Sequence, residues 1–133
     1  MKIFKLWFLV LIWAGFIFWL SSIPNLKTNL ECDLILRKIA HVFEYFILTF
    51  LLYRAFKGSF VTNVFHLFVY PAVFSFFYAA SDEFHQSFVQ GRSGSIRDIF
   101  IDTVGILGFY MVLKVLAFNQ KKIRPLSVPE ARK

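Results

Sequence analysis

The chain has one cysteine, Cys32, in 133 residues, so no disulfide within the chain can stabilise its fold. The residues before Cys32 are not the small ones of a lipoprotein acylation site, and we expect this thiol to have no functional role. Internal repeats, low-complexity segments and linkers are absent as well. The sequence therefore predicts one structural unit.

Acidic residues are scarce: eight Asp and Glu face fifteen Lys and Arg, which gives a formal net charge of +7. A positive charge of this size can indicate nucleic-acid binding, but here the basic residues form no stripe that alternates with polar positions. We expect no nucleic-acid partner. A composition of 58% hydrophobic and 20% aromatic residues, with nineteen Phe, lies far outside the range of soluble domains.

Long polar stretches are missing too, because four apolar runs fill most of the chain. They cover residues 4–23, 38–55, 60–81 and 98–118, roughly 18 to 22 residues each, the length at which an α-helix crosses about 30 Å of hydrocarbon. We predict an all-α fold, a bundle of four transmembrane helices within residues 1–120, followed by a short basic tail at 121–133.

The distribution of basic residues predicts the orientation of the bundle. Ten lie at one end of the runs and five at the other, and the positive-inside bias then places both termini in the cytoplasm. The connections 21–37 and 82–97 would face outward. The first run has no small-x-small cleavage site and three more runs follow it, so we expect an uncleaved helix rather than a signal peptide.

The acidic residues gather at the predicted outward end. Seven of the eight carboxylates lie in or beside the two outward connections, and several are inside helix ends, where ionisable groups are costly. The seven are Glu31, Asp33, Glu44, Asp82, Glu83, Asp98 and Asp102.

Three of the runs turn polar side chains toward one another at this end. The helical spacing places Lys38, His41, Glu44 and Tyr45 on one side of the second run. In the third run, which we expect to continue to about Phe88, positions i, i+3, i+4 and i+7 hold Tyr78, Ser81, Asp82 and His85. In the fourth run Asp98 and Asp102 are one turn apart, and Gly105 and Gly108 would let another helix approach closely.

Two interpretations of this cluster are open. Ion pairs with Arg37, Lys38, Arg92 and Arg97 could simply fix the helix register, which is the favoured reading for Glu31 and Asp33. Alternatively, the groups line a functional pocket. We favour the pocket, because three polar faces hold more titratable groups than four helices need to stay together.

A metal and an anion are both conceivable ligands of such a pocket. The cluster has enough N and O donors to bind a metal, but it lacks the compact His-Glu-x-x-His spacing. The sequence therefore does not decide whether a metal or another cofactor binds. The candidate donors are His41, Glu44, Asp82, Glu83, His85, Asp98 and Asp102. The segment 91–95 enters a helix N-terminus, where Ser95 and Asp98 predict a capping box. With Arg92 and Arg97 it could hold an anion, although the lysine of a P-loop is missing.

Five segments of the chain resemble the VanZ-like family of small bacterial membrane proteins. They are Ser21-Ser22-Ile23-Pro24, the Lys-x-x-His-x-x-Glu-Tyr pattern of 38–45, Ser-Asp-Glu-x-x-Gln at 81–86, Gly91-Arg92, and 98–105. The resemblance covers about residues 15–110, with Gln90 where the family often has Pro. It implies a multi-pass protein of the bacterial cytoplasmic membrane, and importance for Lys38, His41, Glu44, Asp82, Glu83, Gln86, Arg92, Asp98 and Asp102.

The resemblance also implies a link to the cell envelope, because the name-giving member is associated with low-level resistance to teicoplanin-type glycopeptides. We expect a protein that binds or modifies a lipid-linked or glycolipid-like envelope molecule. Substrate contacts would come from Tyr45, Gln86, Arg92, Ser95, Arg97 and Asp98.

Two alternatives use the same groups. The first is a membrane hydrolase or transferase, with His41 or His85 as the general base tuned by a carboxylate. Its catalytic set would be Lys38, His41, Glu44, Asp82, Glu83, His85 and Asp102, and no serine sits in a nucleophile elbow. The second is a proton-coupled carrier, for which four helices without paired repeats suffice only in a homo-oligomer.

Overall fold

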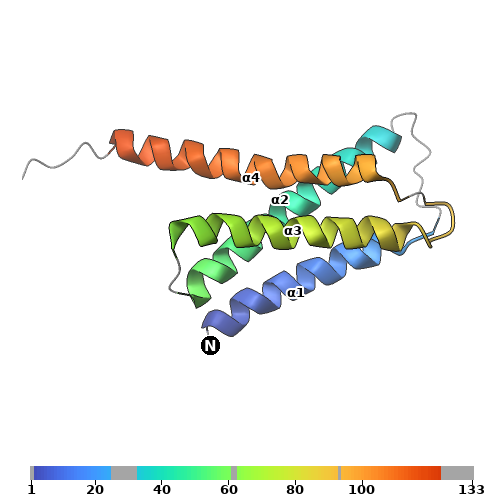
Figure 1. Ribbon diagram of the computed structural model, residues 1–133, viewed down its shortest axis with the longest axis horizontal. Helices are drawn as coiled ribbons and strands as arrows, with labels where there is room; N and C mark the ends of the chain where they lie inside the picture. The colour runs from blue at the N-terminus through green and yellow to red at the C-terminus, as the bar shows by residue number, and fades with distance from the viewer. Residues whose placement is uncertain (1, 25–32, 61–62, 93, 124–133) are drawn as a thin grey trace, which may run out of the picture.

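A computed structural model describes residues 2–24, 33–60, 63–92 and 94–123, and within these ranges it holds four α-helices and no strand (Figure 1). The all-α prediction is confirmed. Glu31, Cys32 and Ser93 lie outside the described residues, as does 124–133 of the predicted tail. The helices are α1 Lys2–Ser21, α2 Asp33–Ser59, α3 Val64–Gln86 and α4 Ile96–Ile123.

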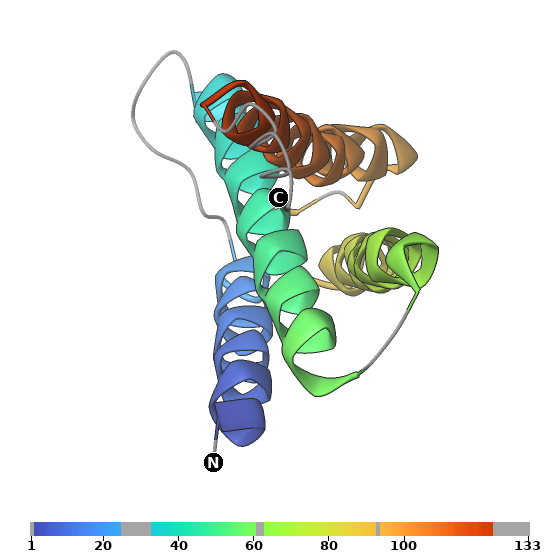
Figure 2. The same cartoon turned by 90° about the vertical axis from the view of Figure 1, so that its left-hand side faces the viewer.

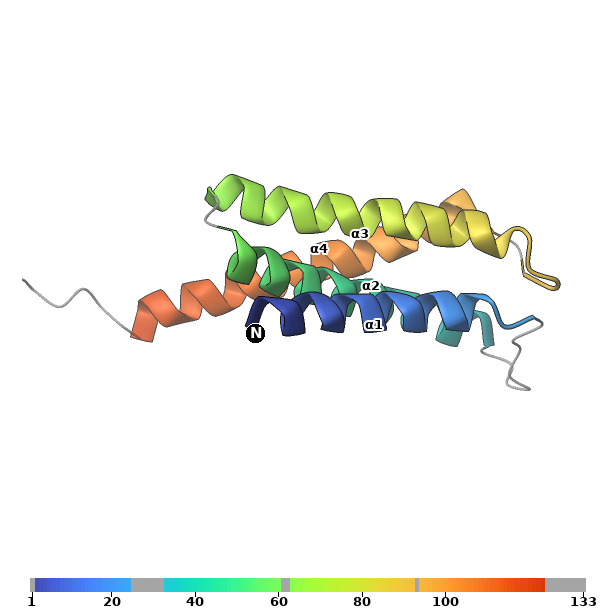
Figure 3. The ribbon, with the colours of Figure 1, turned by 90° about the horizontal axis from the view of Figure 1, so that it is seen from below.

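The helices alternate in direction, so the start of α1 and the end of α4 lie at the same end of the bundle (Figures 1 and 3). The last turns of α1 and α3 meet the first turns of α2 and α4 at the opposite end, which we call the polar end. This end carries the acidic cluster. Several boundaries differ from the predicted runs. Helix α2 begins at Asp33 rather than 38, α3 begins at Val64 rather than 60 and stops at Gln86 rather than near Phe88, and α4 continues to Ile123, into the predicted tail.

Three helices are long and apolar enough to cross a membrane: α1, α3 and residues 96–120 of α4. The protein is therefore a membrane protein by length and composition. Helix α2 has 27 residues but carries polar groups along one side, and it packs against all three other helices. Figure 2 shows it in the middle, with α1, α3 and α4 around it. It stays a prediction that α2 crosses the bilayer together with these three helices. Its central position would shield its polar groups from lipid.

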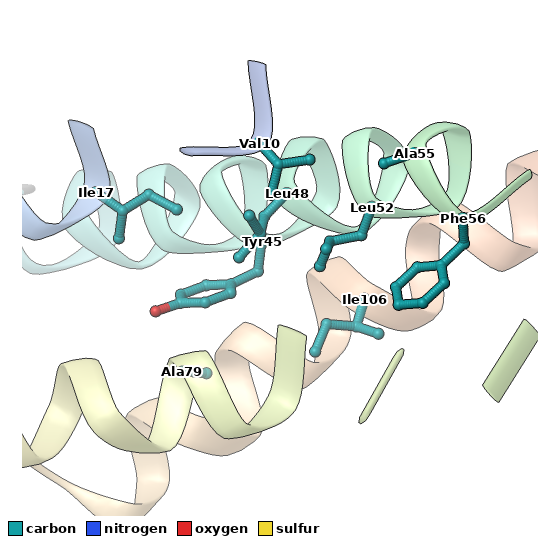
Figure 4. Packing of buried hydrophobic residues seen from close by; sticks show 9 residues of the cluster. All are labelled: Val10, Ile17, Tyr45, Leu48, Leu52, Ala55, Phe56, Ala79 and Ile106. Carbon is teal, nitrogen blue, oxygen red and sulfur yellow. The ribbon is translucent and has the colours of Figure 1, made fainter. Parts of the chain in front are cut away.

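The apolar core is a narrow seam along α2. Figure 4 shows Tyr45, Leu48 and Leu52 of α2 with Val10 and Ile17 of α1 on one side and helices α3 and α4 on the other. Many large apolar side chains lie outside this seam, exposed on the bundle surface, as lipid contact requires.

Gly105 sets the distance between α2 and α4. A Cβ atom at this position would collide with the backbone carbonyl oxygen of Val42, whereas one at Gly108 would meet the Phe46 ring at 3.7 Å, an ordinary contact. The expected close approach at Gly105 is thus confirmed, and its helix partner is α2.

The side of the membrane that each end faces is a prediction with a direct test. A reporter fused after Lys133 should be active in the cytoplasm, and one inserted near Asn25 should be active outside, because most Lys and Arg flank the termini. Paired phosphatase and fluorescent-protein fusions in a bacterial host measure both positions. The opposite labelling would place the polar end in the cytoplasm.

Candidate functional site

Three side chains that can bind a metal meet at the polar end. Each comes from a different helix, and each is buried or half-buried. A ring nitrogen of His41 (α2) and carboxylate oxygens of Glu83 (α3) and Asp102 (α4) all lie within 4.8 Å of one another. A hydrogen bond of 3.1 Å joins His41 Nδ1 to Asp102 Oδ1. Glu44 Oε2 lies 4.0 Å from the same nitrogen. We call His41, Glu83 and Asp102 the central triad.

The glycine contact explains why His41 and Asp102 meet. Asp102 is one turn before Gly105 and lies on the same face of α4. Val42, whose carbonyl faces Gly105, follows His41 directly in α2. Close approach of the two backbones therefore places the Asp102 carboxylate, which is fully buried, beside the imidazole.

The polar face of α3 is rotated from the one expected. The buried positions near its end are Asp82, Glu83 and Gln86, while Ser81 is exposed and donates to the carbonyl of its own helix at Tyr78 (2.8 Å). Gln86 Nε2 donates to Asp82 Oδ2 (2.8 Å) and, more weakly, to Glu83 Oε1 (3.5 Å). The expected face was wrong for Ser81, because α3 packs against α2 and α4 with Asp82 and Glu83 buried and Ser81 exposed.

His85 and Tyr78 belong to the contact with α1 instead. His85 Nε2 shares a hydrogen bond with the hydroxyl of Ser22 (3.0 Å), and its ring packs against Phe18 with centroids 4.5 Å apart. The Tyr78 hydroxyl donates to the carbonyl of Ala14 (2.6 Å). The structure therefore does not bring His85 into the central triad.

Arg92 joins the end of α1 to α3. Its Nη2 donates to the carbonyl of Leu20 (2.6 Å) in the last turn of α1, and its Nε donates to the carbonyl of Ile23 (3.3 Å) just after the helix. Its Nη1 donates to Gln86 Oε1 (3.3 Å). Burial, and then the nearby charge of Arg37, lowers the pKa of Arg92.

The start of α4 is capped by Ser95, as predicted, but with a different carboxylate partner. Ser95 Oγ accepts from the amide of Arg97 (3.2 Å), and the amide of Ser95 donates to Glu83 Oε2 (2.9 Å). Glu83 of α3 thus takes the place expected for Asp98. The Ser95 amide, which the sequence suggested as a donor to a bound anion, therefore binds the Glu83 carboxylate instead. A negative charge is favourable at the N-terminus of a helix.

A cavity of about 160 Å³ adjoins the central triad between the end of α1 and the start of α2. His41 and Glu44 border it on α2, and Arg92 borders it from the α3–α4 connection. Sequence analysis missed part of this wall: small or apolar lining residues carry no chemical signal, and Arg37 was seen as an ion-pair partner alone. The lining residues are Leu20, Ser21, Arg37, Ala40, His41, Glu44 and Arg92.

The remaining predicted residues lie around the triad rather than in it. Lys38 and Arg97 are exposed, and Asp98 is half-buried in the first turn of α4. Tyr45 is fully buried, and its hydroxyl has no hydrogen-bond partner among the described residues. The same is true of Asp82 Oδ1 and Asp102 Oδ2, so each of three helices contributes one such oxygen at the polar end.

Comparison with known proteins places these features in a family. The profile of the VanZ/LLP1 family matches residues 4–117. An uncharacterized membrane protein of Bacillus subtilis (strain 168), YwnJ, is 39% identical over 87 residues, which cover 65% of this chain and 54% of the relative. The chain thus spans about half the length of that curated relative. No solved structure matches. The expected resemblance is confirmed, and the chain belongs to the VanZ/LLP1 family of membrane proteins.

Proposed function

We propose that this protein binds the polar head of a lipid-linked or glycolipid-like envelope molecule in the cavity at the polar end, on the outer side of a bacterial cytoplasmic membrane. The observation that carries the proposal is the cavity itself. It lies at the polar end of a membrane protein, and His41, Glu44 and Arg92 border it.

The cavity wall offers both donors and acceptors. Arg92 donates to three protein acceptors, and a guanidinium has further N–H groups that can reach an anionic oxygen. Glu44 can accept from sugar hydroxyls on the α2 wall. This combination suits a head group that carries phosphate and sugar, and it suits a plain acyl chain poorly.

The surface beside the cavity suits the apolar part of such a molecule. On α2, Ile39 is 47% and Phe43 is 61% exposed, and they flank the cavity-lining residues of that helix. On α1, Phe16 and Trp19 are also exposed. An isoprenoid or acyl chain could therefore lie along α1 and α2 while its head enters the cavity.

Filling the cavity tests the proposal. Ala40 lines it, and Ala40→Trp should weaken binding of a polyprenyl pyrophosphate at least about tenfold, because the indole occupies the space that the head group needs. Binding would be measured by native mass spectrometry of the protein in nanodiscs, together with teicoplanin susceptibility of a host that expresses it.

Ala117→Trp is the matched control, because Ala117 is exposed near the C-terminal end of α4, away from the polar end. It should bind and protect like the natural chain. If Ala40→Trp binds the probe as tightly as this control, the cavity is not the binding site.

A second candidate function has its own observation in support. His41 borders the cavity and pairs through Nδ1 with the buried Asp102, the arrangement in which a carboxylate orients an imidazole for proton transfer. A hydrolase or transferase would use the other ring nitrogen as general base. Release of phosphate from the pyrophosphate probe would favour this candidate over binding alone.

A further inference from the structure

We propose that the central triad binds a divalent transition-metal cation, of the zinc or manganese type, inside the bundle. One imidazole nitrogen and two carboxylate oxygens converge there from α2, α3 and α4, all within 4.8 Å of one another. The ligands come from three helices, which explains why no compact metal motif occurs in the sequence. The site would exist whether or not a head group occupies the cavity.

The spacing of the donor atoms is close to that of a bound ion. Zinc–nitrogen and zinc–oxygen distances are about 2.0–2.2 Å, so neighbouring ligands of a tetrahedral ion lie about 3.3–3.6 Å apart. The His41–Asp102 pair, at 3.1 Å, is already close to this spacing. The Glu83 donor lies within 4.8 Å of the other two donors. Binding one ion would bring it closer by up to about an ångström, a movement on the scale of a side-chain rotation.

The charges near the triad favour a cation. Four acids lie near the triad: Glu44, Asp82, Glu83 and Asp102. Among the described residues, Asp102 and Glu44 form ion pairs, and both pairs are with His41. Asp82 adds a further buried carboxylate, whose charge acts on Asp102 and Glu44. Arg92 also acts on Glu44, Asp82 and Glu83 from the far side of the cavity. Buried carboxylates are normally paired or coordinate a metal, and these four acids outnumber His41 and Arg92.

Two oxygen atoms supply an independent observation. Asp102 Oδ2 and Asp82 Oδ1 are buried and make no hydrogen bond within the part of the chain that the structure describes. Asp102 is 0% and Asp82 is 3% exposed. A buried acceptor without a donor is destabilising by about 1–3 kcal/mol or more, and a cation at the triad would remove this cost for Asp102, one of its ligands.

Surrounding contacts hold the ligands in place, as in established metal sites. The amide of Ser95 holds Glu83 Oε2, which leaves Oε1 with a weak contact from Gln86. The cavity beside His41 gives the ion a route from outside. The imidazole favours zinc, and the two carboxylates also suit manganese. Calcium and magnesium prefer ligand sets made of oxygen alone.

The test uses the full chain, purified in detergent and stripped with EDTA. Manganese chloride, zinc chloride and magnesium chloride are titrated separately in a calorimeter. We expect one saturable site per chain for manganese or zinc, and weaker binding of magnesium. His41→Gln and Asp102→Asn should each lose more affinity than the roughly 10- to 100-fold that loss of an outer contact costs. His66→Gln is the control, because His66 is exposed and stacks on Tyr70 away from the polar end.

Circular dichroism checks that each variant is helical. If His41→Gln or Asp102→Asn unfolds, metal binding is tested on the natural chain instead. Its melting temperature should rise with manganese or zinc and much less with magnesium. Absence of any saturable site, no rise in melting temperature, or equal affinity in folded His41→Gln and Asp102→Asn would each overturn the proposal.

Discussion

Cells that express Asp102→Asn or Glu44→Gln should contain as much of the protein as cells with the natural chain, yet lose the phenotype that it confers, such as altered glycopeptide or detergent tolerance. Both substitutions preserve size and hydrogen bonding while removing a charge. Asp102 is fully buried beside His41, and Glu44 borders the cavity. If these charges work in binding or proton transfer, the isosteres remove function and spare the fold.

The ion-pair interpretation expects a different result. Breaking a buried charge network by removing one partner typically costs about 3–5 kcal/mol of stability, so abundance would fall together with phenotype. Immunoblot abundance, melting temperature in detergent and the susceptibility of a sensitive host therefore have to be measured on the same variants.

His41→Gln should behave like the two isosteres, with His66→Gln as the matched control at an exposed position. Full phenotype in both Asp102→Asn and Glu44→Gln at normal abundance would exclude an ionised pocket as the functional part. Parallel loss of abundance and phenotype would assign these residues to the scaffold.

Gly105→Ala should lower the melting temperature more than Gly108→Ala or Gly15→Ala. The new Cβ would collide with the backbone carbonyl of Val42, which cannot rotate away as a side chain can. Overpacking of this kind typically costs about 1–3 kcal/mol. Because Gly105 and Asp102 share a face of α4, separation of α2 and α4 would also pull Asp102 from His41.

Two glycines in the same chain control for the loss of backbone freedom. A Cβ at Gly108 meets the Phe46 ring at 3.7 Å, and one at Gly15 meets nothing within 4 Å. Gly108→Ala and Gly15→Ala should therefore melt near or above the natural chain, since alanine favours a helix over glycine. Equal melting of all three variants would contradict the close contact of α2 and α4.

The helices were predictable from the sequence because their apolar runs are long and Pro24, Ser95 and the connections interrupt them clearly. Residue spacing placed His41 and Asp102 on the polar faces of α2 and α4, which the sequence predicts to meet at one end, and Gly105 indicated which face of α4 lies close to another helix. These signals are local to one helix each, so the amino-acid order was sufficient for them. The specific hydrogen bond between His41 and Asp102 was not predicted.

The rotation of α3 was not predictable in the same way. Ser81 and Asp82 are neighbours, and packing against α2 and α4 decides that Asp82 and Glu83 are buried while Ser81 is exposed. The role of Arg92 depends on the carbonyls at the end of α1, and backbone acceptors leave no trace in a sequence. Both misses come from contacts between different helices, which a pattern within one helix does not reveal.

The most direct test of a working pocket at the polar end is an experimental structure of the protein in nanodiscs made with bacterial lipids. We expect density for a head group in the cavity between Arg92, His41 and Glu44, with His41 and Asp102 within hydrogen-bonding distance. A cavity filled by the protein's own side chains, with His41 and Asp102 apart and facing lipid, would contradict the account.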